Sequence, residues 1–592
     1  MKTVTCILVY WLNNLGTFVM LRSLITGGLC KMATKWWQNE VVYQIYPRSF
    51  QDTNHDGIGD IQGMIDHLDY IQALGVTMIW VSPIYTSPMV DMGYDIADYQ
   101  NIDPQFGTLD DFKRFLAAAK ERNIKVIMDL VVNHSSDQHA WFKAALADPT
   151  SKYRDYYMFK QTDDGQVPNN WRSIFGGSTW EPVPNEPGNY YFHTFAPEQP
   201  DLNWENPALR REIYDMINWW LELGVAGFRV DAITHLKKDL DWASLPADGS
   251  DGLVTVIKKG QNRPGIDVFL EELKTETFDK YDAITVGEAY GVPEADLAKY
   301  IGPDGYFSMI FDFSYMNIDV KNTDEWYRGR GEWTAKDLRD ILFASQAQAS
   351  REHGTLANVL ENHDQPRTLS KLVPNPADQT PTAAKTLATM YYFLPGLPFI
   401  YQGQELGMKN FKRADISEFN DVSSLNNYHM AIQDGYTPAE ALASINAKSR
   451  DNARTPMQWD GSEYGGFSDA QPWLAMGTDR EGINVADELA DENSVLHYYR
   501  ALGALRHTPE WEAVITTGAF EPLTDLPDTV VGYRRRQDQR TLTVLVNLTS
   551  AQTRVQLTDD GQTLLQVGEV DRTPAEIIMT GYSAVVIGQD VK

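Results

Sequence analysis

From Val41 onward, short runs of apolar residues alternate with longer segments in which apolar residues recur every three or four positions. The first pattern is typical of buried strands and the second of amphipathic helices. Strand-like runs occur at residues 41–50, 76–83, 125–134, 226–233, 283–290, 306–315, 356–364 and 397–407. The clearest helical patterns cover residues 61–75, 109–123 and 207–224.

Continuous apolar strands that alternate with helices predict a parallel sheet and an α/β fold. Eight such units predict a closed (β/α)8 barrel, the TIM barrel. A doubly wound open sheet is the alternative. It is less favoured, because no G-x-G-x-x-G motif follows the first strand.

Two segments depart from this alternation. Residues 135–202 are rich in Pro, Gly, Asn, Trp and Tyr and contain no long helical pattern, which predicts a small domain inserted after strand 3. Residues 516–592 contain short strand patterns and predict a C-terminal antiparallel β-domain; the expected strands are 529–536, 541–550, 553–558, 563–567 and 583–588. The barrel would then comprise residues 33–134 and 203–515.

Residues 1–32 are apolar with a basic start at Lys2, which faintly resembles a secretory signal. Polar residues interrupt the apolar runs, among them Asn13, Arg22 and Lys31, and a second methionine stands at Met32. We therefore interpret the segment as a leader or an over-extended N-terminus. No apolar run reaches the roughly 20 residues of a membrane helix.

Composition narrows the class of partner. The 592 residues carry a net charge of −30, which repels nucleic acid and anionic membranes and leaves a neutral small oligosaccharide as the better partner. The two cysteines, Cys6 and Cys30, lie in the first segment, so the body of the chain has neither a disulfide framework nor a catalytic thiol. This suits a cytoplasmic location. We expect a monomer or a weak homo-oligomer.

Charged residues gather at the ends of several predicted strands. In a TIM barrel the active site forms at the carboxyl ends of the strands. Charged groups there cost solvation energy unless they are paired or used. The residues concerned are Asp129, Asn133 and His134 on strand three, Arg229 and Asp231 on strand four, Glu288 on strand five, and His363 and Asp364 on strand seven.

These carboxylates suit the hydrolysis of a glycoside, which needs one ionised and one protonated carboxyl group. Arg229 precedes Asp231 by two residues and shares its face of the strand, so it would keep Asp231 ionised as the nucleophile. Glu288 lies in the apolar and aromatic context VGEAYG, which would raise its pKa and make it the acid/base. Asp364 could hold sugar hydroxyls while positive charge builds at the anomeric carbon.

Five motifs carry a family resemblance: DLVVNH (129–134), QPDLN (199–203), GFRVD (227–231), GEAYG (287–291) and ENHDQPR (361–367). From about Trp36 to its C-terminus the chain resembles glycoside hydrolase family 13, the α-amylase family, in its oligo-1,6-glucosidase/α-glucosidase branch. The resemblance implies Asp231 as nucleophile, Glu288 as proton donor and Asp364 as transition-state stabiliser. It places His134, His363 and Arg229 at substrate-binding and supporting positions.

Two further segments match the family's pocket for a non-reducing end. In DMGYDI (91–96) the resemblance implies that Asp91 grips a terminal glucose hydroxyl and that Tyr94 stacks under the ring. In ARTPMQW (453–459), Arg454 would pair with Asp91 and close the site beyond one sugar, which predicts an exo-acting enzyme. The alternative for this pair is an ordinary surface salt bridge.

The segment from Asp52 to Asp60 has oxygen ligands at alternate positions and a glycine, Gly57, for a tight turn. This is the spacing of an EF-hand-like calcium loop without its distal Glu. In the family branch the matching loop binds Ca²⁺, so we expect a structural ion held by Asp52, Asn54, Asp56, Ile58 and Asp60. A polar turn is the alternative.

Linkage preference should depend on Ala232, which follows the nucleophile; His235 and Tyr290 would face the same space. In the family branch, Val at this place accompanies α-1,6 preference and Thr or Ala accompanies α-1,4. We therefore expect a retaining exo-α-glucosidase that leans to α-1,4 (maltose-type) substrates, with some transglucosylation.

The alternatives are an oligo-1,6-glucosidase, or a transglucosylase or sucrose isomerase on the same scaffold. The isomerases carry an arginine-rich RLDRD-type segment where this chain has PRTLSKLVPNPADQT. Non-catalytic relatives are membrane-anchored and lose carboxylates, whereas this chain keeps all three.

Overall fold

Eight parallel strands close into a barrel in the computed structural model, which describes residues 35–590 except 250, 324, 558–559 and 574. The strands, in chain order, are β1 (Val42–Ile45), β2 (Met78–Val81), β5 (Lys125–Leu130), β10 (Gly227–Val230), β12 (Ile284–Gly287), β13 (Met309–Phe311), β14 (Leu356–Val359) and β15 (Leu397–Tyr401). Each falls inside a predicted run, and β1 pairs with both β2 and β15. The barrel is therefore confirmed, and the open sheet is excluded.

The barrel strands are buried except at Lys125, the first residue of β5, which explains their nearly continuous apolar sequences. The predicted leader lies outside the described residues. The chain divides into two units, Met1–Trp36 and Trp37–Lys592, and all eight barrel strands belong to the second. No helix among the described residues is long and apolar enough to cross a membrane.

Local signals in the sequence set the helix ends. Helix α3 (Leu109–Glu121) begins at Thr108, whose side chain forms a capping box with Asp111. Helix α5 (Pro207–Leu223) starts with a proline and ends at Gly224, which has a φ of 111°. The predicted helix 61–75 is instead two helices, α1 (Ile61–Asp66) and α2 (Leu68–Ala73), because the backbone at His67 leaves the helical region.

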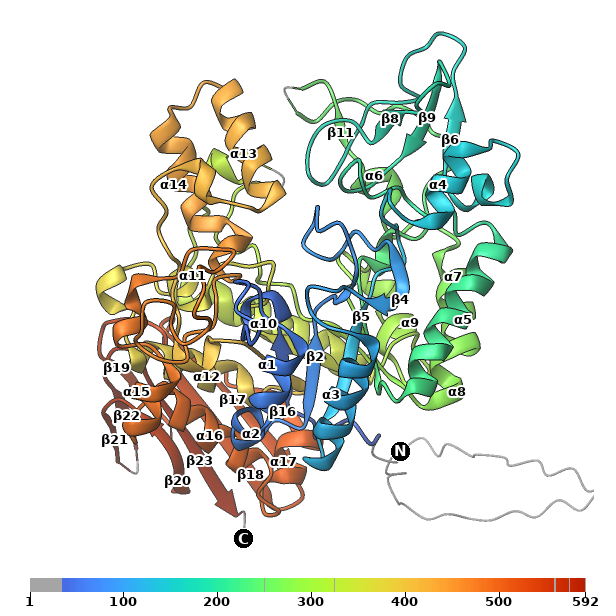
Figure 1. Ribbon diagram of the computed structural model, residues 1–592. Helices are drawn as coiled ribbons and strands as arrows, with labels where there is room; N and C mark the ends of the chain where they lie inside the picture. The colour runs from blue at the N-terminus through green and yellow to red at the C-terminus, as the bar shows by residue number, and fades with distance from the viewer. Residues whose placement is uncertain (1–34, 250, 324, 558–559, 574, 591–592) are drawn as a thin grey trace, which may run out of the picture. The chain divides into compact units, whose positions relative to one another are not determined.

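The other helices, also seen in Figure 1, are α4 (Ala140–Ala147), α6 (Ile257–Gly260), α7 (Ile266–Leu273), α8 (Asp279–Tyr281), α9 (Leu297–Ile301), α10 (Ala335–Arg351), α11 (Thr368–Leu372), α12 (Pro381–Tyr392), α13 (Val422–Gln433), α14 (Pro438–Lys448), α15 (Val485–Ala490), α16 (Val495–Arg506) and α17 (Glu512–Thr517). The α13–α14 pair contacts the inserted segment, because Asn426 Nδ2 donates to the carbonyl oxygen of Phe175 at 2.7 Å.

The inserted segment forms a small three-stranded sheet of β6 (Phe159–Gln161), β9 (Asn189–Phe192) and β8 (Trp180–Pro182). A fourth strand, β7 (Trp171–Arg172), pairs with β11 (Val254–Thr255), which comes from the loop after β10. Arg172 fixes this junction through ion pairs with Asp251 at 2.7 Å and Asp248 at 2.9 Å. The loop that follows Asp231 is therefore packed against the inserted segment.

A second small sheet, β3 (Tyr85–Thr86) with β4 (Asp98–Ile102), carries the DMGYDI segment between its strands.

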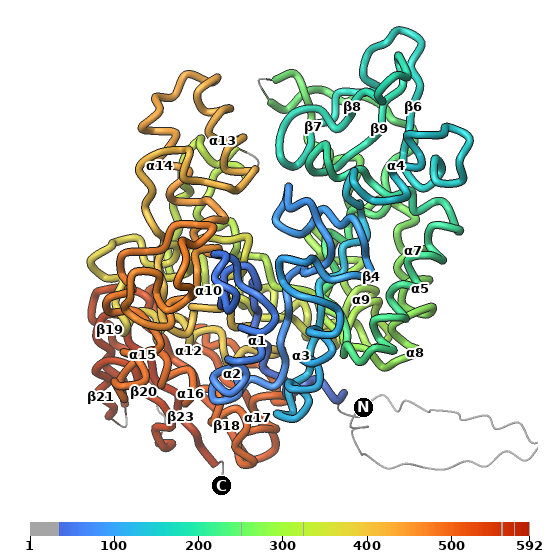
Figure 2. Tube along the Cα trace, viewed as in Figure 1, coloured from blue at the N-terminus to red at the C-terminus, as the bar shows by residue number. Residues whose placement is uncertain are grey.

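The C-terminal region is antiparallel, as predicted: β16 (Ala519–Pro522), β17 (Val530–Gln537), β18 (Arg540–Asn547), β23 (Ser583–Asp590) and β20 (Gln562–Val567) form one sheet. A second sheet contains β19 (Thr553–Val555), β22 (Ile577–Met579) and β21 (Val570–Arg572). Strands β16, β21 and β22 lie outside the predicted strand segments. Figure 2 follows the chain through these sheets.

Candidate active site

Arg229 lies at the centre of a cluster of carboxylates at the carboxyl ends of three neighbouring strands. Its Nη1 is 2.6 Å from an oxygen of Asp129 and 2.6 Å from Oδ1 of Asp231, and its Nη2 is 2.8 Å from Oε2 of Glu288. Strand β10 pairs with β5 and β12, which brings these side chains together. The arginine side chain is 1% exposed, so these ion pairs are shielded from water.

Ala232 helps to orient Glu288. Its backbone N–H donates to Oε2 of Glu288 at 2.9 Å. The backbone of Ala232 is left-handed, with a φ of 45°, a conformation that costs a non-glycine residue about 1 kcal/mol or more. The turn after β10 therefore carries both Asp231, the candidate nucleophile, and the backbone N–H group that binds Glu288.

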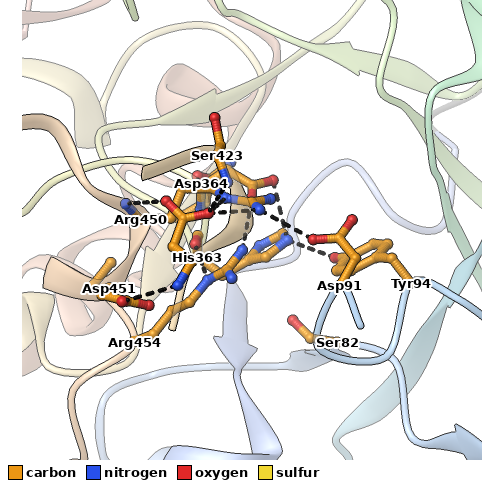
Figure 3. A network of polar contacts seen from close by, with 12 residues as sticks. Ser82, Asp91, Tyr94, His363, Asp364, Ser423, Arg450, Asp451 and Arg454 are labelled. Atoms are coloured by element: carbon orange, nitrogen blue, oxygen red, sulfur yellow. Dashed lines mark hydrogen bonds and ion pairs between the residues drawn. The ribbon is translucent and has the colours of Figure 1, made fainter. Parts of the chain in front are cut away.

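Asp364 lies in a network of polar contacts with Arg450, Arg454 and His363 (Figure 3). Its Oδ1 accepts from Arg454 Nη2 at 3.0 Å and lies 3.3 Å from Arg450 Nη1. His363 Nε2 is 3.1 Å from its other oxygen. Since Gln44 donates to Nδ1 of His363 at 2.8 Å, the ring proton lies on Nε2, where it faces Asp364 and Tyr94.

The predicted pairing of Asp91 with Arg454 is wrong. Oδ1 of Asp91 pairs with Nη2 of Arg450 at 3.0 Å (Figure 3). Arg454 is occupied elsewhere, because its Nε donates to the carbonyl of His363 and its Nη2 binds Asp364. The sequence RDNAR contains two arginines four residues apart, and nothing in it indicates which one turns toward Asp91. The pair itself is buried, with Asp91 6% exposed, so it is not a surface salt bridge.

Tyr94 and His134 lie beside the cluster. Tyr94 is stacked on the ring of His363, with centroids 5.2 Å apart, and its hydroxyl donates to Asp129 at 3.0 Å. Nε2 of His134 is 3.1 Å from both the carbonyl of Tyr94 and Nε2 of Gln199. Gln199 in turn donates to Asp91 at 3.3 Å, so His134 reaches the pocket through this amide.

Comparison with known proteins decides the family. The model of the α-amylase catalytic domain matches residues 44–514. The chain belongs to the α-amylase family, glycoside hydrolase family 13. It is 42% identical to an oligo-1,6-glucosidase of Heyndrickxia coagulans over 93% of this chain and 99% of that protein. It is 44% identical to an α-glucosidase of Pediococcus pentosaceus over 83% of this chain and 87% of that protein.

Solved structures agree with this membership. The trehalulose synthase MutB of Pseudomonas mesoacidophila MX-45 matches with a TM-score of 0.87 and 36% identity, over 94% of this chain and 100% of that one. Membership in this family, together with the similarity to the oligo-1,6-glucosidase and the α-glucosidase, makes the protein a glycoside hydrolase, and more narrowly a glucosidase.

The protonation of the two central carboxyl groups follows from burial and from Arg229. Burial raises the pKa of Glu288 to about 8, and Arg229 opposes this shift. Burial also raises the pKa of Asp231, to about 7, although Arg229 lowers it as the sequence had suggested. Arg229 is shared among three carboxylates, so it does not by itself keep Asp231 ionised. Burial therefore raises the pKa of both carboxyl groups, and Arg229 opposes the shift in each.

The pKa values of Asp364 and His363 are both lowered, but for different reasons. The neighbouring His363, Arg450 and Arg454 outweigh burial and hold the pKa of Asp364 well below its usual range. Burial lowers the pKa of His363 to about 3, so the imidazole is neutral at neutral pH. Asp364 is therefore a fixed negative charge, which suits the stabilisation of positive charge on a sugar.

We expect the dependence of kcat/KM on pH to be bell-shaped. If Asp231 is the nucleophile and Glu288 the acid/base, Asp231 must be ionised and Glu288 protonated, so activity rises as pH passes the pKa of Asp231, about 7, and falls above the pKa of Glu288, about 8. Rates of glucose release from maltose, whose leaving group needs the proton of Glu288, measured from pH 4 to about 10 test this. In Glu288→Gln the alkaline fall should vanish, because no titrating acid remains; an unchanged alkaline limb would contradict the assignment.

Three residues near the site were not predicted as part of it. The resemblance to the family points to Arg454 and not to Arg450. Gln199 is part of the QPDLN motif, to which the sequence assigns no separate role. Lys238 is fully buried, with its Nζ 2.5 Å from Asp201 and 2.9 Å from Oδ1 of Asn133. Its sequence context, THLKKDL, is that of an exposed charged turn, so no signal marked it.

Proposed function

We propose that the protein is a retaining, exo-acting α-glucosidase that releases glucose from the non-reducing ends of short α-glucosides. The observation that carries this proposal is the binding of Asp231 and Glu288 to the two terminal nitrogens of one guanidinium, that of Arg229. This keeps the two carboxyl groups close together. Retaining glycosidases hold them about 5–5.5 Å apart, because the second carboxylate attacks the sugar directly.

The reaction has two balanced steps. Asp231 attacks the anomeric carbon while Glu288 gives its proton to the departing glycosidic oxygen, which leaves a glucosyl ester on Asp231. Glu288, now ionised, takes a proton from water, and the water oxygen displaces Asp231 from the anomeric carbon. A sugar hydroxyl can replace that water, so some transglucosylation accompanies hydrolysis.

The exo mode rests on the pair of Asp91 and Arg450. Arg450 also pairs with Asp421 at 2.8 Å and lies over the ring of Phe175 at 5.2 Å. Charges fixed in this way can bind the hydroxyls of one terminal glucose and leave no room for a chain to continue.

Products from maltotriose test this function. Proton NMR should detect α-glucose as the first anomer, and chromatography should detect glucose and maltose in equal amounts at early times. A β anomer would contradict retention, and products from internal cleavage of longer chains would contradict the exo mode.

For linkage we propose a preference for α-1,4 over α-1,6 bonds, on the ground that Ala232 leaves space beyond the cleaved bond. The two named relatives point in different directions and differ by only two percentage points in identity. We expect wild-type kcat/KM to be higher for maltose than for isomaltose, and Ala232→Val to lower the maltose value about tenfold. The rates of glucose release from both sugars measure this.

Ala232→Thr is the matched control, because Thr has the same branching and meets the same backbone strain at a φ of 45°. The ratio of maltose to isomaltose hydrolysis should stay nearer to wild type in Thr than in Val. If isomaltose is the better wild-type substrate, the linkage preference is wrong and the carboxylate roles are unaffected.

We also propose that the loop from Asp52 to Asp60 binds a structural Ca²⁺. Among the described residues no group of three or more His, Cys, Asp or Glu side chains is arranged as a metal site. The loop nevertheless shares the backbone of a calcium-binding loop, because Gly57 has a φ of 87° at the position that calcium loops reserve for glycine. Side-chain oxygens of Asp52, Asn54 and Asp56 accept N–H groups within the loop. Asp60 is engaged by Thr53 and the N–H of Gly63.

Calcium should therefore raise thermal stability. An ion present at about 100 times its Kd stabilises the folded state by about 2.7 kcal/mol, so the Tm should rise by a few degrees over that in EDTA. Asp56→Ala should remove this rise, while Asp163→Ala, an exposed acid elsewhere, should keep it. Equal Tm values in calcium and in EDTA would contradict the proposal.

A further inference from the structure

A surface groove of about 470 Å³ lies apart from the carboxylate cluster. We call it the Trp473 groove; it is lined by residues 417, 418, 420, 463, 464, 471–476 and 480. None of Asp231, Glu288, Asp364, Asp91 and Arg450 lines it. Its volume falls in the range of ligand sites, roughly 300–1,000 Å³.

Two lining residues of the groove connect it to the segments that carry Asp91 and Arg450. Met92 and Trp473 pack together against the buried cluster of Tyr46, Tyr401 and Ala453. Met92 follows Asp91 in the chain. The N–H of Asn420, which also lines the groove, donates to Asp451, the neighbour of Arg450, at 2.7 Å. The groove therefore adjoins the segments that carry Asp91 and Arg450, but neither residue lines it.

The groove has a rigid aromatic floor. The indole N–H of Trp473 donates to Ser49 Oγ at 2.9 Å, its backbone N–H donates to the carbonyl of Gly57, and the guanidinium of Arg48 lies 4.7 Å from its ring centroid. Tyr464 adds a second half-buried ring to the lining. Rings that are fixed before binding lose little entropy, and their faces pack against the apolar face of a pyranose.

The polar lining indicates a neutral ligand. Glu418, Glu463 and Arg480 contribute charges of both signs, and Gln471 contributes an amide. Planar carboxylate, guanidinium and amide groups can each bond two adjacent hydroxyls. A phosphate-rich ligand is disfavoured by the acids and by the net charge of −30, and a wholly apolar one by the charged lining.

We propose that the Trp473 groove is a second carbohydrate site that holds a segment of α-glucan outside the catalytic pocket. The ligand class rests on the proposed function, because an α-glucosidase meets such chains as substrates. Binding here does not lead into the active site, so it concentrates the protein on longer chains without changing the hydrolysis of maltose.

The probe is β-cyclodextrin, a ring of α-1,4-linked glucose without a non-reducing end, which a one-sugar exo pocket cannot accept. Titration calorimetry on the full chain should detect millimolar or tighter binding. Tyr464→Ala should weaken it about tenfold, because a stacking ring is lost. Glu463→Ala, which changes only an exposed side chain, should weaken it less. Tyr281→Ala is the matched control, an exposed tyrosine on α8, and should bind as wild type does.

Both groove variants should hydrolyse maltose with kcat and KM within about twofold of wild type, which also shows that they fold. Three results overturn the proposal: no binding of β-cyclodextrin, equal binding by wild type and Tyr464→Ala, or loss of binding in Tyr281→Ala. Failure of the α-glucosidase proposal is distinguishable, because the titration does not depend on turnover.

Discussion

Asp231→Asn should lower kcat for p-nitrophenyl α-glucoside by on the order of 10⁴–10⁶-fold. The amide has nearly the same shape as the carboxylate but is not a nucleophile, so no glucosyl ester forms. The hydrogen bond from Arg229 to the remaining oxygen keeps the geometry of the site. Steady-state rates measure the loss, and an unchanged Tm shows that the variant is folded.

Glu288→Gln distinguishes the roles of the two carboxyl groups. With p-nitrophenolate, a leaving group that needs no proton, the first step should proceed much faster than with maltose. The variant should therefore lose far more activity on maltose than on the aryl glucoside, whereas Asp231→Asn loses both equally. Asp163→Asn, an exposed acid, is the matched control and should be fully active. Equal losses on both substrates in Glu288→Gln would contradict the acid/base role.

Lys238→Met should lower the free energy of unfolding by about 3–5 kcal/mol. The ammonium of Lys238 is fully buried, and its removal leaves the equally buried carboxylate of Asp201 without a counter-charge. Asp201 also accepts from Thr194, and Asn133 donates to it, so the charge lies where the inserted segment meets strands β5 and β10. Thermal and denaturant unfolding measure the change.

Lys237→Met is the matched control for this variant. Lys237 is the preceding residue and pairs with Glu205 at a more exposed site, where an ion pair contributes up to about 1 kcal/mol. The double variant Lys238→Met/Asp201→Asn should recover part of the loss, because no buried charge is then unpaired. If Lys238→Met lowers the free energy of unfolding no more than Lys237→Met does, the proposed contribution of the ion pair between Lys238 and Asp201 is contradicted.

Much of the site could be predicted because the chemistry follows the strands. Asp129, Arg229, Glu288 and Asp364 each come at or just after the end of an apolar run. A parallel barrel brings all such ends to one face. Alternation along β10 places Arg229 and Asp231 on one side, and their oxygen–nitrogen distance of 2.6 Å agrees with this. These relations depend on the two-residue period of a strand and on the order of the strands along the chain, and the sequence contains both.

The sequence by itself therefore determined the eight-stranded barrel, the family and the positions of the carboxylates relative to the strand ends. Only the tertiary structure decided which arginine pairs with Asp91, where Lys238 lies and whether burial or Arg229 dominates the shift in the pKa of Asp231. The physical reason is that a side chain's partner depends on loop geometry between segments hundreds of residues apart, as for Asp91 and Arg450. The desolvation of a carboxyl group depends on all the atoms packed around it, and no local pattern of residues encodes all of those contacts.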